Sequence, residues 1–133
     1  MIGRRLHNRR GVSGAGGSCF YRAISYQLCE RSGRAYHDDA EVSRLRGKVR
    51  DFLLQNANSA VPTNPQLRWK DLGSYMKGYA EAPVPQATAY VVRCPIIVHL
   101  GKSSFKYGSD MPGKSLHVRL AGMHYSIEYP IQL

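Results

Sequence analysis

Apolar side chains recur with a helical period between residues 38 and 56, and this stretch constrains the fold more than any other part of the chain. The apolar positions are three or four residues apart and would share one face of a helix: Val42, Leu45, Val49, Phe52 and Leu53. Arginines occupy the opposite face. The pattern predicts an amphipathic helix that begins at Asp38 or Asp39 and ends near Asn56.

Two other segments in the first half of the chain predict helices. The segment CFYRAISYQLCERSG begins at Cys19 and predicts a largely buried helix, with Ser18 as its N-cap and Gly33 as its end. Residues 62–67 contain two prolines and are expected to form a turn-rich linker. A short helix is expected over residues 69–79.

The segment that follows alternates between breaks and short regular elements. Pro83 and Pro85 are expected to break the chain before a short helix over residues 86–93. The β-branched run 96–100 predicts a short buried strand. Residues 102–115 are polar and contain glycine and proline, so a loop or an irregular edge is expected there.

The end of the chain predicts a β-hairpin. Residues 116–120 and 123–129 form alternating runs, and Ala121-Gly122 joins them. Helical patterns come first and strands last, which predicts an α+β fold with helices packed on a small, mostly antiparallel sheet. The 133 residues suffice for one compact domain, which we assign to residues 13–133.

The chain is strongly basic, with 19 Lys and Arg against 9 Asp and Glu and a net charge of +10. Four arginines fall in MIGRRLHNRR, so residues 1–12 are expected to form a basic arm that could contact nucleic acid. The remainder lacks the basic and aromatic stripe of a single-strand binder. No apolar run is long enough to span a membrane, and the arm does not lead into a secretory signal. We therefore expect a soluble, cytoplasmic monomer.

The three cysteines, Cys19, Cys29 and Cys94, include no CxxC pair. Their odd number and their spacing argue against a disulfide framework and a four-ligand zinc site. No metal or other cofactor is expected, and Cys29 and Cys94 are expected to be buried as small apolar side chains.

Cys19 differs because it follows a glycine-rich turn and stands at the start of a predicted helix. The unpaired N–H groups and the dipole at a helix N-terminus favour the reactive thiolate. The uncovered backbone of the turn would let the N–H groups of Gly16 or Gly17 and of Cys19 converge on the oxyanion that forms at an attacked acyl carbon. The same spacing also fits a flexible linker followed by a core cysteine.

The segment GGSCFYRAIS resembles the opening motif of the ovarian tumour (OTU) family of cysteine proteases. In that motif Asp-Gly-x-Cys is followed by two apolar or aromatic residues, Arg or His, and Ala or Ser. Two later blocks resemble the family in the same order, namely the helix-then-strand segment 86–98 and the histidine-bearing hairpin 116–129. The resemblance covers about residues 14–130 and implies a compact papain-like fold with Cys19 as nucleophile. Gly16 replaces the family's Asp, so the oxyanion hole is expected to be less preorganised.

The same resemblance implies that His124 is the general base. His124, Ser126 and Glu128 would share one face of the second hairpin strand. The family usually has Asp or Asn where this chain has Ser126, whose hydroxyl can accept a hydrogen bond but carries no charge. A catalytic dyad with Ser126 as a weak third member is therefore expected. Other candidates are Asn8 or Asp110 as the acceptor, and His117 as a competing base.

The resemblance implies hydrolysis of the peptide or isopeptide bond after the C-terminal glycine of ubiquitin or a ubiquitin-like modifier. These modifiers and their conjugates are then the expected partners. Small domains of this family also occur in viral polyproteins and bacterial effectors, so a viral polyprotein protease acting in the host cytoplasm is an alternative. A non-catalytic module that binds ubiquitin or RNA is a second alternative.

Overall fold

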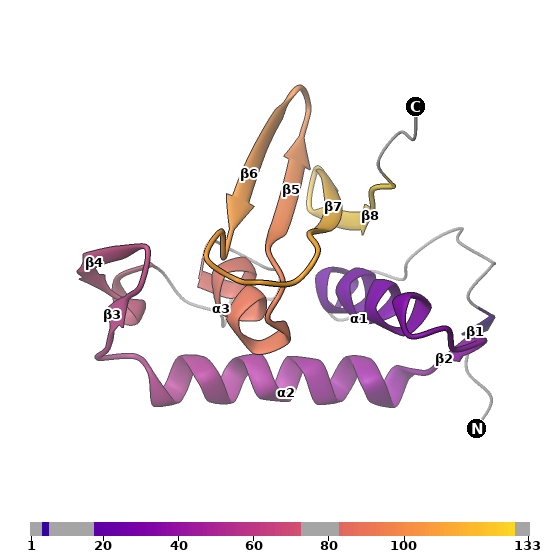
Figure 1. Ribbon diagram of the computed structural model, residues 1–133, viewed down its shortest axis with the longest axis horizontal. Helices are drawn as coiled ribbons and strands as arrows, with labels where there is room; N and C mark the ends of the chain where they lie inside the picture. The colour runs from indigo at the N-terminus through magenta and orange to yellow at the C-terminus, as the bar shows by residue number, and fades with distance from the viewer. Residues whose placement is uncertain (1–3, 6–17, 73–82, 130–133) are drawn as a thin grey trace.

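The computed structural model describes residues 4–5, 18–72 and 83–129, and Figure 1 shows how they are arranged. Three α-helices occur in these ranges, namely α1 (Cys19–Arg31), α2 (Asp39–Gln55) and α3 (Pro83–Val92). Helix α2 runs along one side of the molecule, and α1 and α3 lie between it and the main sheet. None of the helices in these ranges is long and apolar enough to cross a membrane.

The main sheet has four strands in the order β6-β5-β7-β8. Their bounds are β5 (Ile96–Leu100), β6 (Ser103–Tyr107), β7 (Leu116–Ala121) and β8 (His124–Ile127). Strands β5 and β7 are parallel, and the other two pairs are antiparallel. Two smaller antiparallel pairs join β1 (Arg4–Arg5) to β2 (Tyr36–His37), and β3 (Ala60–Val61) to β4 (Asn64–Arg68). The described residues thus form the predicted α+β fold with a mostly antiparallel sheet.

Helix α1 is the centre of the core. It contacts β7 and β8 on one side and α2 on the other. Its Phe20, Ala23 and Ile24 side chains have no exposed surface. Full burial of a side chain such as Phe or Ile contributes about 1.5–3 kcal/mol to the stability of the fold. The core packing of α1 therefore fixes the position of the residue at its N-terminus.

The predicted boundaries of α2 are confirmed, and a capping box explains its start. The Asp38 carboxylate accepts a hydrogen bond from the Glu41 N–H at 3.0 Å. In return the Glu41 carboxylate accepts one from the Asp38 N–H at 3.2 Å. At the other end the Asn56 N–H donates to the Phe52 carbonyl at 3.0 Å and closes the last turn.

The expectation that Pro83 and Pro85 break the chain is wrong, because both lie in the first turn of α3. The N–H groups of a first turn have no acceptor within the helix, so proline costs no hydrogen bond there. Only the beginning of the helix expected over residues 69–79 is described, as the 3-10 turn η2 (Trp69–Leu72). The remainder of that prediction lies outside the described residues.

Two segments expected to be irregular contain strands. Residues 102–115 include β6, which pairs with β5 along its full length and forms a regular edge of the sheet. Most of the linker expected over residues 62–67 belongs to β4, which pairs with β3. Only a short turn separates the two strands. In both cases the pairing partner, and not the local sequence, determines the extended conformation.

After β6, Gly108 brings the chain close to α3. Its φ is +66°, and a Cβ built there would be 2.4 Å from the Cβ of Ala89. The Gly108 N–H donates to the Gln86 side-chain oxygen at 3.3 Å. Two independent reasons therefore require glycine at this position, namely the positive φ angle and the close approach to the helix.

We expect the substitution Gly108→Ala to lower the free energy of unfolding by about 2–5 kcal/mol, since it adds a steric overlap to the left-handed strain. Gly101→Ala is a matched control, because Gly101 has φ +60° and no atom within 4 Å of a built Cβ. The control should lose only about 1–2 kcal/mol. Urea denaturation measures both values, and equal losses would contradict the close approach.

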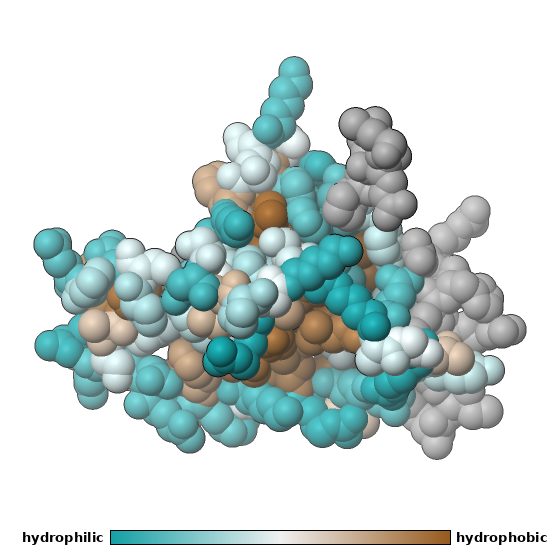
Figure 2. All heavy atoms as spheres, in the orientation of Figure 1, coloured by the Kyte–Doolittle hydropathy of each residue, from teal (hydrophilic) through white to brown (hydrophobic). Residues whose placement is uncertain are grey.

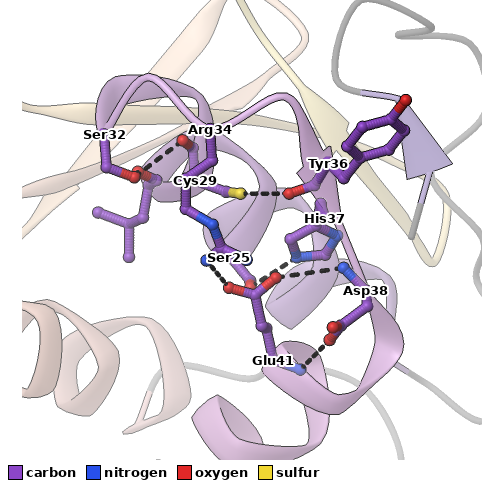
Figure 3. A network of polar contacts seen from close by, with 9 residues as sticks. Ser25, Cys29, Ser32, Arg34, Tyr36, His37, Asp38 and Glu41 are labelled. Carbon is purple, nitrogen blue, oxygen red and sulfur yellow. Dashed lines mark hydrogen bonds and ion pairs between the residues drawn. The ribbon is translucent and has the colours of Figure 1, made fainter. Parts of the chain in front are cut away.

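A polar network joins the C-terminal half of α1 to the start of α2, and Figure 3 shows it from close by. The Ser25 hydroxyl lies 2.7 Å from Nε2 of His37, and both residues are buried. The Cys29 thiol donates to the Tyr36 carbonyl at 3.0 Å. Burial lowers the pKa of His37, so the network is built around a neutral imidazole.

This neutral histidine predicts a loss of stability in acid. Because the pKa of His37 lies below its ordinary value of 6.5, the unfolded chain binds a proton first as the pH falls. The stabilisation is complete above the unfolded pKa and is lost as the pH falls towards the folded one. The free energy of unfolding is measured by urea denaturation at about pH 7.5 and at about pH 5. Between these two pH values His37→Gln should lose less of this free energy than the wild type. Equal losses would contradict this role.

Candidate active site

Cys19 is the first residue of α1, and its side chain is 2% exposed. Ser18 occupies the N-cap position, and its carbonyl accepts the Arg22 N–H at 2.9 Å. The N–H groups of a first helical turn have no acceptor within the helix and give this end a partial positive charge. The fold therefore places the buried Cys19 side chain at the N-terminal end of α1.

The Cys19 sulfur is also in contact with the sheet. The main-chain N–H of Tyr125, on β8, donates to Cys19 Sγ at 3.4 Å. The Tyr125 ring packs edge-on against Phe20, with the ring centroids 5.1 Å apart. Burial raises the pKa of Tyr125 to about 12, so its hydroxyl remains neutral and belongs to the core. Sequence reasoning did not find this donor, because a main-chain group carries no signal of its own.

His124 immediately precedes this donor in the chain. The Tyr125 nitrogen is 3.4 Å from the sulfur and roughly 2.4 Å from the His124 Cα by standard peptide geometry, so that Cα lies within roughly 6 Å of the sulfur. The His124 side chain is exposed, and its ring makes no hydrogen bond to another described residue. The His124 Cα thus lies near the Cys19 sulfur, and the side chain that it carries is exposed.

Glu128 is not free to orient His124, because Arg119 holds it. Arg119 Nε and one terminal nitrogen donate to the two Glu128 carboxylate oxygens, each at 3.0 Å. The hydrogen bond from Arg119 lowers the pKa of Glu128. Ser126 lies opposite Arg119 in the β7–β8 register and is half-buried. The Glu128 carboxylate is therefore already paired with Arg119, and Ser126 remains a candidate for orienting the imidazole.

His117 on β7, the competing base, is fixed against a part of α1 distant from Cys19. Its main-chain carbonyl accepts from the Gln27 side chain at 2.9 Å, and its main-chain N–H donates back at 3.3 Å. Gln27 follows Cys19 by eight residues, or about 12 Å along the helix axis. The His117 ring instead contacts His99, with 3.0 Å between their nitrogens. The pKa of His117 is lowered mainly by burial and, to a smaller extent, by the neighbouring His99.

Of the two other candidates for orienting the His124 ring, Asp110 already has a partner. The Asp110 carboxylate accepts the Tyr90 hydroxyl at 2.8 Å and thereby fastens the loop after β6 to α3. Asn8 lies outside the described residues, as do Gly16 and Gly17 of the expected oxyanion hole. Only the Cys19 N–H of that expected set is described, and it belongs to the first turn of α1.

The other two thiols are less suited to act as nucleophiles. Cys29 is buried, and desolvation, together with the nearby Glu41, raises its pKa and disfavours the thiolate. Cys94 is half-buried and donates to the Val92 carbonyl at 3.5 Å. Within the described ranges, no group of three or more His, Cys, Asp or Glu side chains is arranged to hold a metal ion.

No family model matches the sequence, and no curated protein matches it significantly. Among solved structures, the chain is similar to an OTU domain determined in complex with ubiquitin, with 20% sequence identity and a TM-score of 0.58. The match covers 85% of this chain but 64% of that one, so this chain spans less than two thirds of its length. The chain therefore has the fold of an ovarian tumour (OTU) domain.

Proposed function

We propose that the chain is a cysteine-type deubiquitinase that cleaves the bond after the C-terminal glycine of ubiquitin or a ubiquitin-like modifier. The observation that supports the proposal is the hydrogen bond from the Tyr125 N–H to Cys19 Sγ at 3.4 Å, because His124 precedes Tyr125 in the chain and its Cα therefore lies within roughly 6 Å of the sulfur. The similar solved OTU domain binds ubiquitin, which supports the choice of substrate. The activity would belong in the cytoplasm, where the modifier and its conjugates would be the partners.

In the proposed reaction His124 takes the proton of the Cys19 thiol, and the resulting thiolate attacks the carbonyl carbon of the substrate glycine. The oxyanion would be stabilised by the Cys19 N–H and by the backbone of Gly16 and Gly17. Protonated His124 then gives its proton to the leaving amine, and a thioester to Cys19 remains. His124 next deprotonates a water molecule, whose attack releases the modifier acid and restores the thiol.

The Tyr125 N–H would assist by stabilising the thiolate. A main-chain donor aimed at the sulfur stabilises the charged form more than the neutral one. The Arg119–Glu128 pair joins β7 to the end of β8 and so fixes the strand that carries both His124 and this N–H. The site would thus operate as a dyad, with Ser126 as a weak third member that orients the ring.

A ubiquitin probe with a C-terminal electrophile tests the nucleophile and the base. We expect the wild type to form one covalent adduct, Cys19→Ala to form none, and His124→Ala to react at least about 100-fold more slowly, which is the usual contribution of a general base. Adduct formation measured by intact mass gives the rates.

The matched controls are Cys29→Ala and His117→Ala, which should retain labelling at Cys19. An adduct that persists in Cys19→Ala would overturn the assignment of the nucleophile. If the folded wild type forms no adduct but binds ubiquitin or RNA, the non-catalytic module is the better account. Selective cleavage of a viral polyprotein junction with no ubiquitin labelling would favour the polyprotein protease.

Removal of the weak third member should have a small effect. Ser126→Ala is expected to lower kcat/KM for a fluorogenic ubiquitin C-terminal amide by less than about tenfold, since the lost interaction is one neutral hydrogen bond of roughly 0.5–1.5 kcal/mol. Ser126→Asn should keep or raise the activity, because an amide oxygen can also accept from the imidazole. A loss of 100-fold or more in Ser126→Ala would show that the site is a full triad.

A further inference from the structure

A groove of about 360 Å³ lies between α1 and α2, beyond the part of α1 that carries Cys19. Each helix lines it with residues spaced i, i+3, i+4 and i+7, which form a single helical face. The lining residues are Ser25, Leu28 and Cys29 of α1 with its C-cap Ser32, and Glu41, Arg44, Leu45 and Lys48 from α2. Arg34 and the end of α3, Val91 and Val92, complete the lining of what we call the basic groove.

The basic groove has an apolar part and a charged part. Leu28, Leu45, Val91 and Val92 are buried or half-buried and form the apolar part. Arg34, Arg44 and Lys48 are exposed and form the charged part. Figure 2 shows apolar atoms in the middle of this face, above the row of hydrophilic atoms that α2 presents. A ligand in the groove could therefore pack an apolar group and pair a negative charge at the same time.

The positive charge of the basic groove is only partly neutralised. The Glu41 carboxylate pairs with Arg34 and accepts the Asp38 N–H, and Figure 3 shows it turned towards both. Arg44 and Lys48 form no ion pair with any carboxylate in the described part of the chain. Two cations one helical turn apart thus line the groove without an ion-pair partner among the described residues.

We propose that the basic groove binds a small phosphate-bearing organic anion of about mononucleotide size. The volume of about 360 Å³ lies within the range of small-molecule sites, roughly 300–1,000 Å³. An arginine fork matches phosphate oxygens, so Arg44 would hold the phosphates with Lys48 as a second charge, while Arg34 stays paired with Glu41. An aromatic or other apolar group would pack on the leucine and valine side chains.

This site is separate from the candidate active site and does not rest on the proposed function. The lining residue nearest to Cys19 in α1 is Ser25, six residues further on, or about 9 Å along the helix. Cys29 also lines the groove, but its thiol donates to the Tyr36 carbonyl and is not required for binding an anion. The groove would thus be a binding site and not a second catalytic centre.

A titration of the full chain followed by amide NMR shifts tests the proposal with ADP, inorganic pyrophosphate and adenosine as the probes. ADP should give saturable shifts at the amides of Leu28, Cys29 and Leu45. Pyrophosphate should bind the same residues more weakly, because it leaves the apolar part uncovered. Adenosine should show no saturable binding over the same concentrations, because it carries no phosphate.

The double variant Arg44→Ser/Lys48→Ser should weaken ADP binding about tenfold or more, the equivalent of about 1.4 kcal/mol. Arg50→Ser/Lys70→Ser is the matched control, because it removes the same charge at exposed positions outside the groove. The control should change the affinity by less than about twofold, as expected for screened charges.

Four results would overturn the proposal. These are no saturable shifts with ADP, saturable shifts only away from the groove, an equal loss of affinity in the two double variants, and equal binding of adenosine and ADP. Pyrophosphate binding as tightly as ADP would overturn the role of the apolar part. Labelling of Cys19 by the ubiquitin electrophile is measured on the same variants, so a failure of one proposal is distinguished from a failure of the other.

Discussion

The packing of α1 against β8 is the contact on which the site depends. Phe20 is fully buried at this junction, and its ring meets the Tyr125 ring edge-on. These apolar contacts place the N-terminus of a helix against the backbone of a strand, so the Cys19 sulfur receives the Tyr125 N–H. A shift of either element by one residue would move the thiol away from His124. The geometry of the site is therefore a consequence of core packing.

The elements that the sequence predicted well are those whose signals are local. Helix α2 has its capping box and its apolar stripe within one segment, and the β7–β8 hairpin turns at Gly122 with φ +61°. Strand β6 was missed because its polar residues become extended only by pairing with β5. The two prolines of α3 were misread because a first helical turn has no N–H to lose.

In the candidate site, too, residues with a local sequence signal could be predicted, and contacts between distant segments could not. Cys19, His124 and Ser126 could be named from motifs along the chain. The Tyr125 N–H and the Arg119–Glu128 pair could not be, because they depend on how α1 meets β8 and on the register of β7 and β8. The structure also removes Glu128 and Asp110 as free acceptors, since each already has a partner. Helix α1 carries the proposed nucleophile Cys19 at its N-terminus and lines the basic groove along its other half.

We propose that Cys19 and His124 form one reactive pair because β8 places them close together. A crystal structure of the adduct with a ubiquitin C-terminal electrophile tests it most directly. The account predicts a covalent bond to Cys19 Sγ, with a His124 ring nitrogen within hydrogen-bond distance of the sulfur or of the leaving-group position. An adduct on Cys29 or Cys94, or a Cys19 adduct in which another histidine occupies that position, would contradict the account.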